Sequence, residues 1–130
     1  MKYNLYIKPI TKKDFEIFIK FLKFINKKLK LKGEIDIHLL DTIAGHSMTT
    51  GVHEIKPDGQ IIIKSLYSGR HIIDVLRTIA HELVHYWQYT NGKFDPKQPV
   101  QDIGGVIEDT ANALAGRYVK EFLYQNKNIL

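Results

Sequence analysis

The apolar residues between Thr11 and Lys30 follow the pattern of an amphipathic helix. In "TKKDFEIFIKFLKFINKKLK" they recur every three or four residues, at Phe15, Phe18, Ile19, Leu22, Ile25 and Leu29. Thr11, with Asp14 three residues later, is typical of a helix N-terminus, and Gly33 is placed to end the helix. We therefore predict a helix whose apolar face packs against a core.

Three short segments after this helix have the composition of β-strands. They are "IDIHLL" (35–40), "MTTGVHEI" (48–55) and "QIIIKSL" (60–66). The intervening "KPDG" has Pro57 and Gly59 at positions typical of a turn. This arrangement predicts an antiparallel hairpin within a small, mostly antiparallel, twisted sheet.

The strands of the hairpin differ in polarity. The continuous isoleucines 61–63 predict a strand that is covered on both faces. The polar segment "HSMTTGV" predicts instead an edge strand that faces solvent or a substrate.

The second half of the chain shows the helical period twice. From Ser68, expected to cap a helix, to the stop signal Asn91-Gly92, the apolar residues are Ile72, Leu76, Ile79, Ala80, Leu83 and Trp87. The period returns within residues 102–126, after a loop of about ten residues, which allows two helices to pack side by side. We predict one α+β domain over residues 1–130.

Composition narrows the class of protein. The chain has 130 residues, 44% of them hydrophobic and 25% charged, which is typical of one globular domain. It has neither an apolar run of about 20 residues nor the features of a signal peptide, so we expect a cytoplasmic protein without a membrane partner. Because there are no cysteines, His, Asp and Glu are the expected ligands for any metal.

Positive charge is concentrated near the N-terminus. Residues 1–32 hold ten lysines against Asp14 and Glu16, a net charge of +8, and the remaining residues contribute −3 to the total of +5. A lysine-rich surface can attract nucleic acid. We favour a solvated helix face, because no arginine or aromatic pattern for reading bases accompanies the lysines.

The segment "HELVH" within the predicted 68–92 helix carries candidate chemistry. Residues four apart lie above one another on a helix, so His81 and His85 can reach one zinc ion. Glu82 is rotated toward a water on that zinc and can act as the general base of a hydrolysis. The three fixed positions would also arise by chance in about one such chain in a hundred.

A third ligand after the motif must be a carboxylate, since no histidine follows His85. Asp95 lies in a predicted loop, Asp102 is explained by helix capping, and Glu121 is near an exposed end. Glu108 lies instead within "GGVIEDTANALAG", whose small residues would let this helix approach the histidines closely. Asn112, one turn later, is a candidate for a hydrogen bond to a ligand imidazole.

"HELVH", followed after 23 residues by "EDTAN", resembles the gluzincin zinc metallopeptidases. Chain length and element order are similar to their smallest members, the minigluzincins, and "EDTANALA" is similar to the ImmA/IrrE-like peptidases. The specific resemblance covers residues 79–115. It implies a minimal zincin fold with zinc bound by His81, His85 and Glu108, and with Glu82 as the base.

The resemblance also implies an edge strand, at about residues 48–54, to which a peptide substrate adds by backbone hydrogen bonds. Members of such families present a Tyr, His or Arg to the oxyanion of the intermediate. The candidates for this oxyanion stabiliser are Tyr118, Arg117, His46 and His53, of which Tyr118 is the one we name. His38 and His71 are expected to be structural.

The sequence thus predicts a zinc-dependent endopeptidase that hydrolyses peptide bonds with a metal-activated water. One alternative is a zinc-stabilised regulatory module that binds nucleic acid or protein without peptidase activity. Another is a latent or regulatory peptidase that acts on one partner only, such as a repressor or a DNA-bound protein. Three protein ligands beside Glu82 favour a peptidase over the binding module, because a catalytic zinc keeps one coordination position open.

Overall fold

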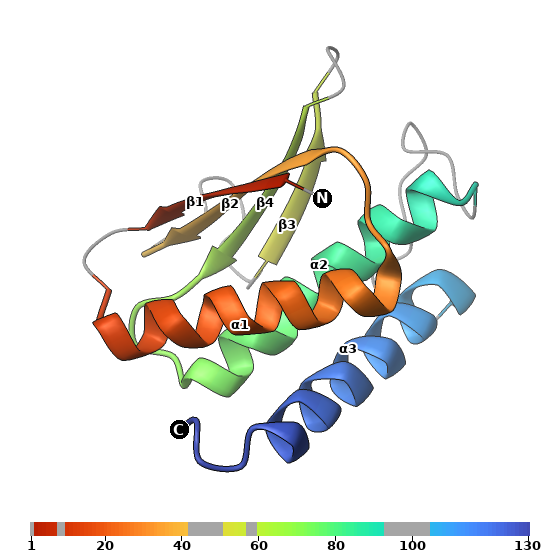
Figure 1. The fold of residues 1–130 in the computed structure, drawn as a ribbon. Coiled ribbons are helices and arrows are strands. Elements are labelled where there is room, and N and C mark those ends of the chain that lie inside the picture. Colours follow the sequence, from red (N-terminus) through yellow and green to blue (C-terminus); the bar gives the residue numbers. More distant parts are fainter. Residues whose placement is uncertain (1, 8–9, 42–50, 57–59, 93–104) are drawn as a thin grey trace.

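A mixed β-sheet and a set of helices make up the described part of the chain (Figure 1). The structure is a computed structural model, and it describes residues 2–7, 10–41, 51–56, 60–92 and 105–130. The elements are β1 (Lys2–Ile7), α1 (Lys12–Leu29), β2 (Glu34–Leu40), β3 (Gly51–Ile55), β4 (Ile61–Leu66), α2 (Ile72–Thr90) and α3 (Val106–Gln125). The predicted α+β class is confirmed.

The strand order in the sheet is β1-β2-β4-β3. β3 and β4 pair antiparallel, so the predicted hairpin is confirmed. β2 pairs parallel with both β1 and β4, and the prediction of a mostly antiparallel sheet is therefore wrong. The physical reason is the connection: α1 carries the chain back across the sheet between β1 and β2, as parallel neighbours require. β1 itself was not predicted.

One face of the sheet packs against helices, and no described helix lies on the other face (Figure 1). Along β4 the inward residues Ile61, Ile63 and Ser65 are buried, whereas Ile62 and Lys64 between them are only partly buried. The prediction that this strand is covered on both faces is therefore wrong, because α1 and α2 lie on the same side of the sheet.

The first helix follows its sequence signals closely. The Thr11 hydroxyl accepts a hydrogen bond from the Asp14 amide at 3.1 Å, and the helix ends at Leu29, four residues before Gly33. Most of its apolar face is buried, but Phe15, which the sequence assigned to that face, is 43% exposed. Phe21 meets Phe122 of α3 edge to face at 5.1 Å between ring centroids. Its lysines are exposed to solvent, at positions 12, 13, 20, 23, 27, 28 and 30.

The second helix lies between the sheet and α3 (Figure 1). It is capped by His71, whose Nδ1 accepts from the Ile73 amide at 3.1 Å, so the predicted cap at Ser68 is wrong. The Ser68 hydroxyl donates instead to the Asp41 carboxylate. α2 buries residues on both sides, and Glu82, His85 and Gln88 are polar residues among them. Within the described ranges, no helix is long and apolar enough to cross a membrane.

Candidate metal centre

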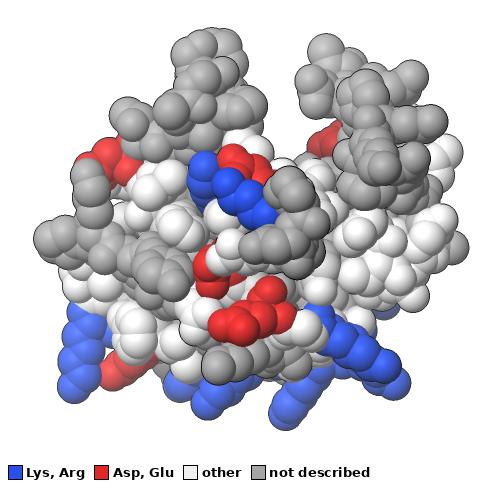
Figure 2. Space-filling model, turned by 90° about the horizontal axis from the view of Figure 1, so that it is seen from above, with Lys and Arg blue, Asp and Glu red and all other residues white. Residues whose placement is uncertain are grey.

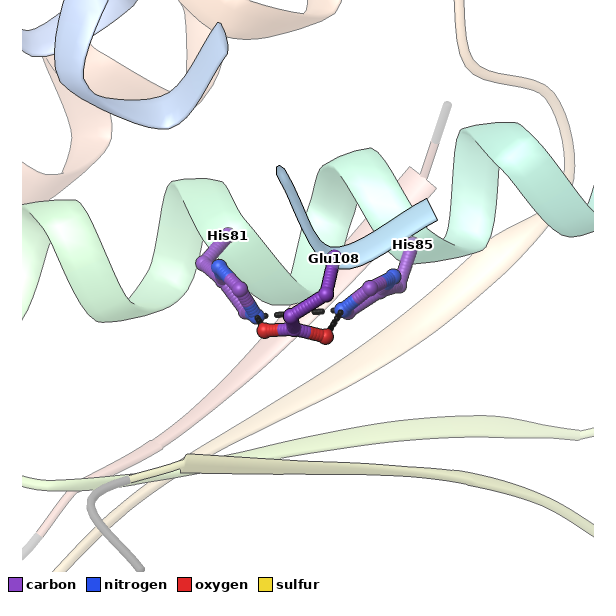
Figure 3. Close-up of side chains that lie close together, drawn as sticks. All are labelled: His81, His85 and Glu108. Carbon is purple, nitrogen blue, oxygen red and sulfur yellow. Dashed lines mark hydrogen bonds and ion pairs between the residues drawn. The ribbon is translucent and has the colours of Figure 1, made fainter. Parts of the chain in front are cut away.

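His81, His85 and Glu108 converge where α3 begins beside the middle of α2 (Figure 3). The Glu108 carboxylate bridges the imidazoles, with Oε1 2.7 Å from Nε2 of His81 and Oε2 3.0 Å from Nε2 of His85. The two Nε2 atoms are 3.0 Å apart. One ligand atom from each residue therefore points at a common centre, and the group could hold a metal ion.

Helix geometry and small side chains produce this convergence. His81 and His85 are one turn apart on α2, so their rings leave the same side of the helix. On α3, Ala111 and Ala115 are fully buried, and their short side chains let the two helices approach closely. The side chain of His85 is 3% exposed, and those of His81 and Glu108 are 17% and 16% exposed, so the centre stays open to solvent on one side.

Gln88 determines which nitrogen of His85 carries the proton. Its amide nitrogen donates to the carbonyl of Ile107 at 3.0 Å, which turns its amide oxygen toward Nδ1 of His85 at 2.8 Å. An amide oxygen only accepts, so Nδ1 of His85 must be the donor. In the neutral ring, Nε2 then presents a lone pair to Glu108 and His81.

Burial favours this neutral ring. It lowers the pKa of His85 below the usual 6.5, although the nearby carboxylate of Glu82 and the Gln88 hydrogen bond act in the opposite direction. A neutral imidazole is the form that binds metals. His85 is therefore prepared as a ligand by its surroundings.

The donor set fits a cation at the centre. A lone pair of His85 facing a carboxylate at 3.0 Å is repulsive unless a proton or a metal ion lies between them. Ligand atoms around tetrahedral zinc are about 3.3 Å apart, because each bond is about 2.0–2.1 Å long. The observed separations of 2.7–3.0 Å are slightly shorter, so a movement of a few tenths of an ångström would accommodate the ion.

Glu82 lies beside the cluster but contacts a different residue. Its Oε2 is 2.7 Å from Nδ1 of His53 on β3, and its side chain is only 8% exposed. The His53 ring also lies against the His85 ring, with centroids 5.2 Å apart. The general base predicted from the sequence is thus held between the helix and the strand at the sheet edge.

Strand β3 packs unusually closely on α2. A Cβ atom added to Gly51 would lie 2.4 Å from Cγ2 of Thr78 and 3.5 Å from Cγ of Glu82. Only glycine leaves room for this approach, since such a contact is far below van der Waals distance. The close packing brings His53, two residues later, within reach of Glu82.

Other predicted site residues are placed differently. Asn112, the residue expected to hydrogen-bond a ligand imidazole, is exposed on α3, and Nδ1 of His85 donates to the amide oxygen of Gln88. Tyr118 packs against the hydrophobic core ten residues after Glu108, which corresponds to about 15 Å along a helix. Arg117 is paired with Glu121 at 3.2 Å.

Some of the predicted residues cannot be compared with the structure. His46, Asp95, Asp102 and residues 48–50 of the predicted edge strand lie outside the described residues. The described part of that strand, Gly51–Ile55, is the last strand at its end of the sheet, as predicted.

Sequence reasoning missed two features of the centre. Gln88 shares a helix side with His85 at a spacing of three residues, a signal that could have identified it. The contact of His53 with Glu82 had no such signal, because 29 residues separate them.

Searches of protein-family models, curated proteins and solved structures found no match for this chain.

Proposed function

We propose that the protein is a zinc-dependent endopeptidase of the gluzincin type. The observation that carries the proposal is the convergence of His81, His85 and Glu108 from two helices, with Glu82 adjacent to them. Two histidines of the motif and a carboxylate 23 residues later each place one ligand atom at a common centre, which supports a metal site.

Zinc is the metal that these donors favour. Two imidazole nitrogens and one carboxylate, with no cysteine in the chain, match the three protein ligands of catalytic zinc sites. The chemistry that zinc supplies in such a site is Lewis-acid polarisation of a carbonyl group and acidification of water.

Glu82 is the proposed general base. Its carboxylate accepts a proton from the attacking water as the new C–O bond forms, and it returns the proton to the leaving nitrogen as the amide C–N bond breaks. Its low exposure supports this role, because excluding bulk water strengthens the electrostatic interactions of a carboxylate with the groups around it.

The sheet edge supports a peptide as the substrate. β3 is the edge strand at one end of the sheet. Its edge away from β4 has no strand partner among the described residues. An extended peptide can hydrogen-bond to such an edge through its backbone. Because His53 on this strand touches Glu82, a peptide aligned there would lie near the base and the metal ligands.

Metal content tests the centre directly. Protein purified without chelator is measured by mass spectrometry as wild type, His85→Ala, Glu108→Ala and Glu82→Gln. We expect about one zinc per chain in wild type and Glu82→Gln, and loss of zinc in the other two variants. Wild type that cannot be loaded with zinc, or Glu108→Ala that binds it unchanged, would overturn the proposal.

Hydrolysis is then measured on fluorescence-quenched peptide pools and on unfolded casein. Zinc-loaded wild type should cleave peptide bonds, and zinc-loaded Glu82→Gln should lose at least about 100-fold in rate, the contribution of a general base. Equal rates for the two proteins would remove Glu82 from the reaction.

The alternative, a zinc-stabilised binding module, draws on the exposed lysines of α1. Figure 2 shows Lys and Arg side chains projecting along one margin of the molecule, where they could meet a polyanion. A DNA mobility shift that weakens steeply with salt, together with zinc binding but no hydrolysis, would favour this module over the peptidase.

A further inference from the structure

We propose that His53 is a positioning residue that orients the Glu82 carboxylate and couples it to strand β3. This inference rests on the proposed peptidase function and adds to it a residue outside the "HELVH" motif and the ligand set. It is carried by the 2.7 Å contact between Nδ1 of His53 and Oε2 of Glu82.

The direction of this hydrogen bond follows from its partners. An ionised carboxylate can only accept, so Nδ1 of His53 must carry the proton. A carboxylate held through one oxygen cannot turn freely about its last torsion angle, which leaves Oε1 in a defined place. A base whose oxygen is fixed reaches its proton without first losing rotational freedom.

The backbone beneath His53 is also fixed. Gly51 packs against Thr78 and the stem of Glu82 so closely that no side chain fits there. Thr78 is held in turn, because its hydroxyl donates to the Asp74 carbonyl at 3.1 Å and accepts from Arg70 at 2.9 Å. The length of the His53–Glu82 contact is thus set by how closely β3 packs on α2.

This arrangement joins substrate alignment to the chemistry. β3 is the strand whose outer edge would pair with a peptide, and the same strand carries the group that orients the base. Any displacement of β3 from α2 would therefore change the orientation of Glu82 as well as the docking edge.

Kinetics of zinc-loaded variants tests the role. His53→Ala should lower kcat by about 10–100-fold, the usual effect of removing a group that orients a functional residue, with KM and zinc content unchanged. His53→Asn keeps an N–H donor near the position of Nδ1 and should recover most of the lost kcat. The matched control is His38→Ala, at a position on the outer face of β2, which should leave kcat unchanged.

A second pair of variants changes the contact without changing His53. Gly51→Ala should push β3 away from α2 and reduce kcat, because the new Cβ meets Cγ2 of Thr78. Thr78→Ser removes that methyl group and keeps the hydroxyl. The Gly51→Ala/Thr78→Ser protein should therefore regain kcat, while Thr78→Ser alone should match wild type.

Nitrogen NMR of the imidazoles provides a readout that does not need activity. In the zinc-loaded protein, Nδ1 of His53 should be protonated, and its N–H signal should shift in Glu82→Gln, where the acceptor loses its charge. An unprotonated Nδ1, or a signal that Glu82→Gln leaves in place, would overturn the contact itself.

The outcomes separate the two proposals. Active wild type whose kcat survives His53→Ala removes the positioning role and leaves the peptidase intact. Zinc-loaded wild type that cleaves no peptide removes the reaction and this role with it, even if the NMR contact is present. Loss of kcat in His53→Ala that His53→Asn does not restore would also count against positioning through the N–H donor.

Discussion

The metal centre and the outer face of the sheet are both polar clusters, but their donors and acceptors are arranged in opposite ways. On the outer face, the side-chain amides of Asn4 and Gln60 donate to the Asp36 carboxylate at 3.0 and 2.6 Å. Lys64 likewise pairs with Glu54 at 2.8 Å. Figure 2 shows charged side chains of both signs on this face. At the centre, by contrast, the lone pair of His85 and the carboxylate of Glu108 face one another.

This difference distinguishes a polar cluster that stabilises the fold from one that is suited to binding a cation. A cluster in which every acceptor meets a donor stabilises the fold by itself, at about 0.5–1.5 kcal/mol for each hydrogen bond. A cluster of converging acceptors lowers its free energy only when a cation joins it. On the outer face, the carboxylates of Asp36 and Glu54 already meet donors, whereas the centre could gain stability by holding a metal ion.

The largest effect is expected when the convergence of acceptors is removed. Glu108→Gln should weaken zinc binding by more than about 100-fold. This exceeds the loss that is typical when a residue hydrogen-bonded to a metal ligand is replaced. The same change should raise the stability of the metal-free protein by about 1 kcal/mol, because the new amide can donate to the His85 lone pair. Isothermal calorimetry and urea unfolding measure the two effects.

The exposed neighbour Asp109 supplies the control, since Asp109→Asn should change neither quantity. Metal-free Glu108→Gln that unfolds more easily than wild type would show that the carboxylate is a structural group, like Asp36.

The next effect concerns the group that sets the tautomer of His85. Gln88→Leu should weaken zinc binding by about 10–100-fold, because Nδ1 of His85 loses its acceptor. Gln88→Glu keeps an acceptor oxygen but loses the donor to Ile107, and it should bind zinc nearly as well as wild type. Equal weakening in both variants would assign the effect to the Ile107 contact.

A pH dependence should distinguish the two clusters further. Burial lowers the pKa of His85 in the folded protein below its unfolded value of 6.5. At pH values between these two pKa values, the unfolded chain therefore binds more protons than the folded protein. The stability of the metal-free protein should therefore fall as the pH drops below 6.5, by at most about 1.4 kcal/mol per pH unit. Urea unfolding between pH 5 and pH 8 measures the slope, with ~0.1 M salt held constant.

His85→Phe provides the comparison for that slope. The variant lacks the titrating ring, so its stability should change less over the same pH range. An identical slope in both proteins would mean that other groups cause the dependence.

The smallest effect is expected on the outer face. Asp36→Asn leaves one acceptor oxygen for two donors, so it should destabilise the protein by about 0.5–1.5 kcal/mol. Zinc affinity should not change, since Asp36 belongs to the sheet face opposite α2. A measurable loss of zinc in this variant would mean that the two clusters are coupled through the sheet.

Local signals in the sequence predicted the elements well. The cap at Thr11, the antiparallel pairing of β3 with β4, and the α+β class each depend on residues that are near one another in the chain. The predicted turn at Pro57 and Gly59 lies outside the described residues. The parallel pairing of β2 could not be read in the same way, because it depends on the missed strand β1 and on the crossover through α1.

In the candidate centre, too, some residues could be predicted from local sequence signals and others depended on tertiary packing. The "HELVH" spacing placed His81 and His85 on one side of a helix, and the small residues around Glu108 pointed to its approach. The expected roles of Asn112 and Tyr118 depended on which side of α3 faces α2 and how far along it the contact extends. Sequence period alone does not fix either quantity. In the structure, Asn112 is exposed and Tyr118 packs against the hydrophobic core.

Helical periodicity fixes the relative directions of side chains within one element, so the groups that could carry chemistry can be read from the sequence. Which of these groups meet depends on how the elements pack together. The approach of α3 to α2 brings Glu108 to the histidines, and the packing of β3 at Gly51 brings His53 to Glu82. Contacts between distant segments depend on close packing of the whole core, which no short stretch of sequence encodes.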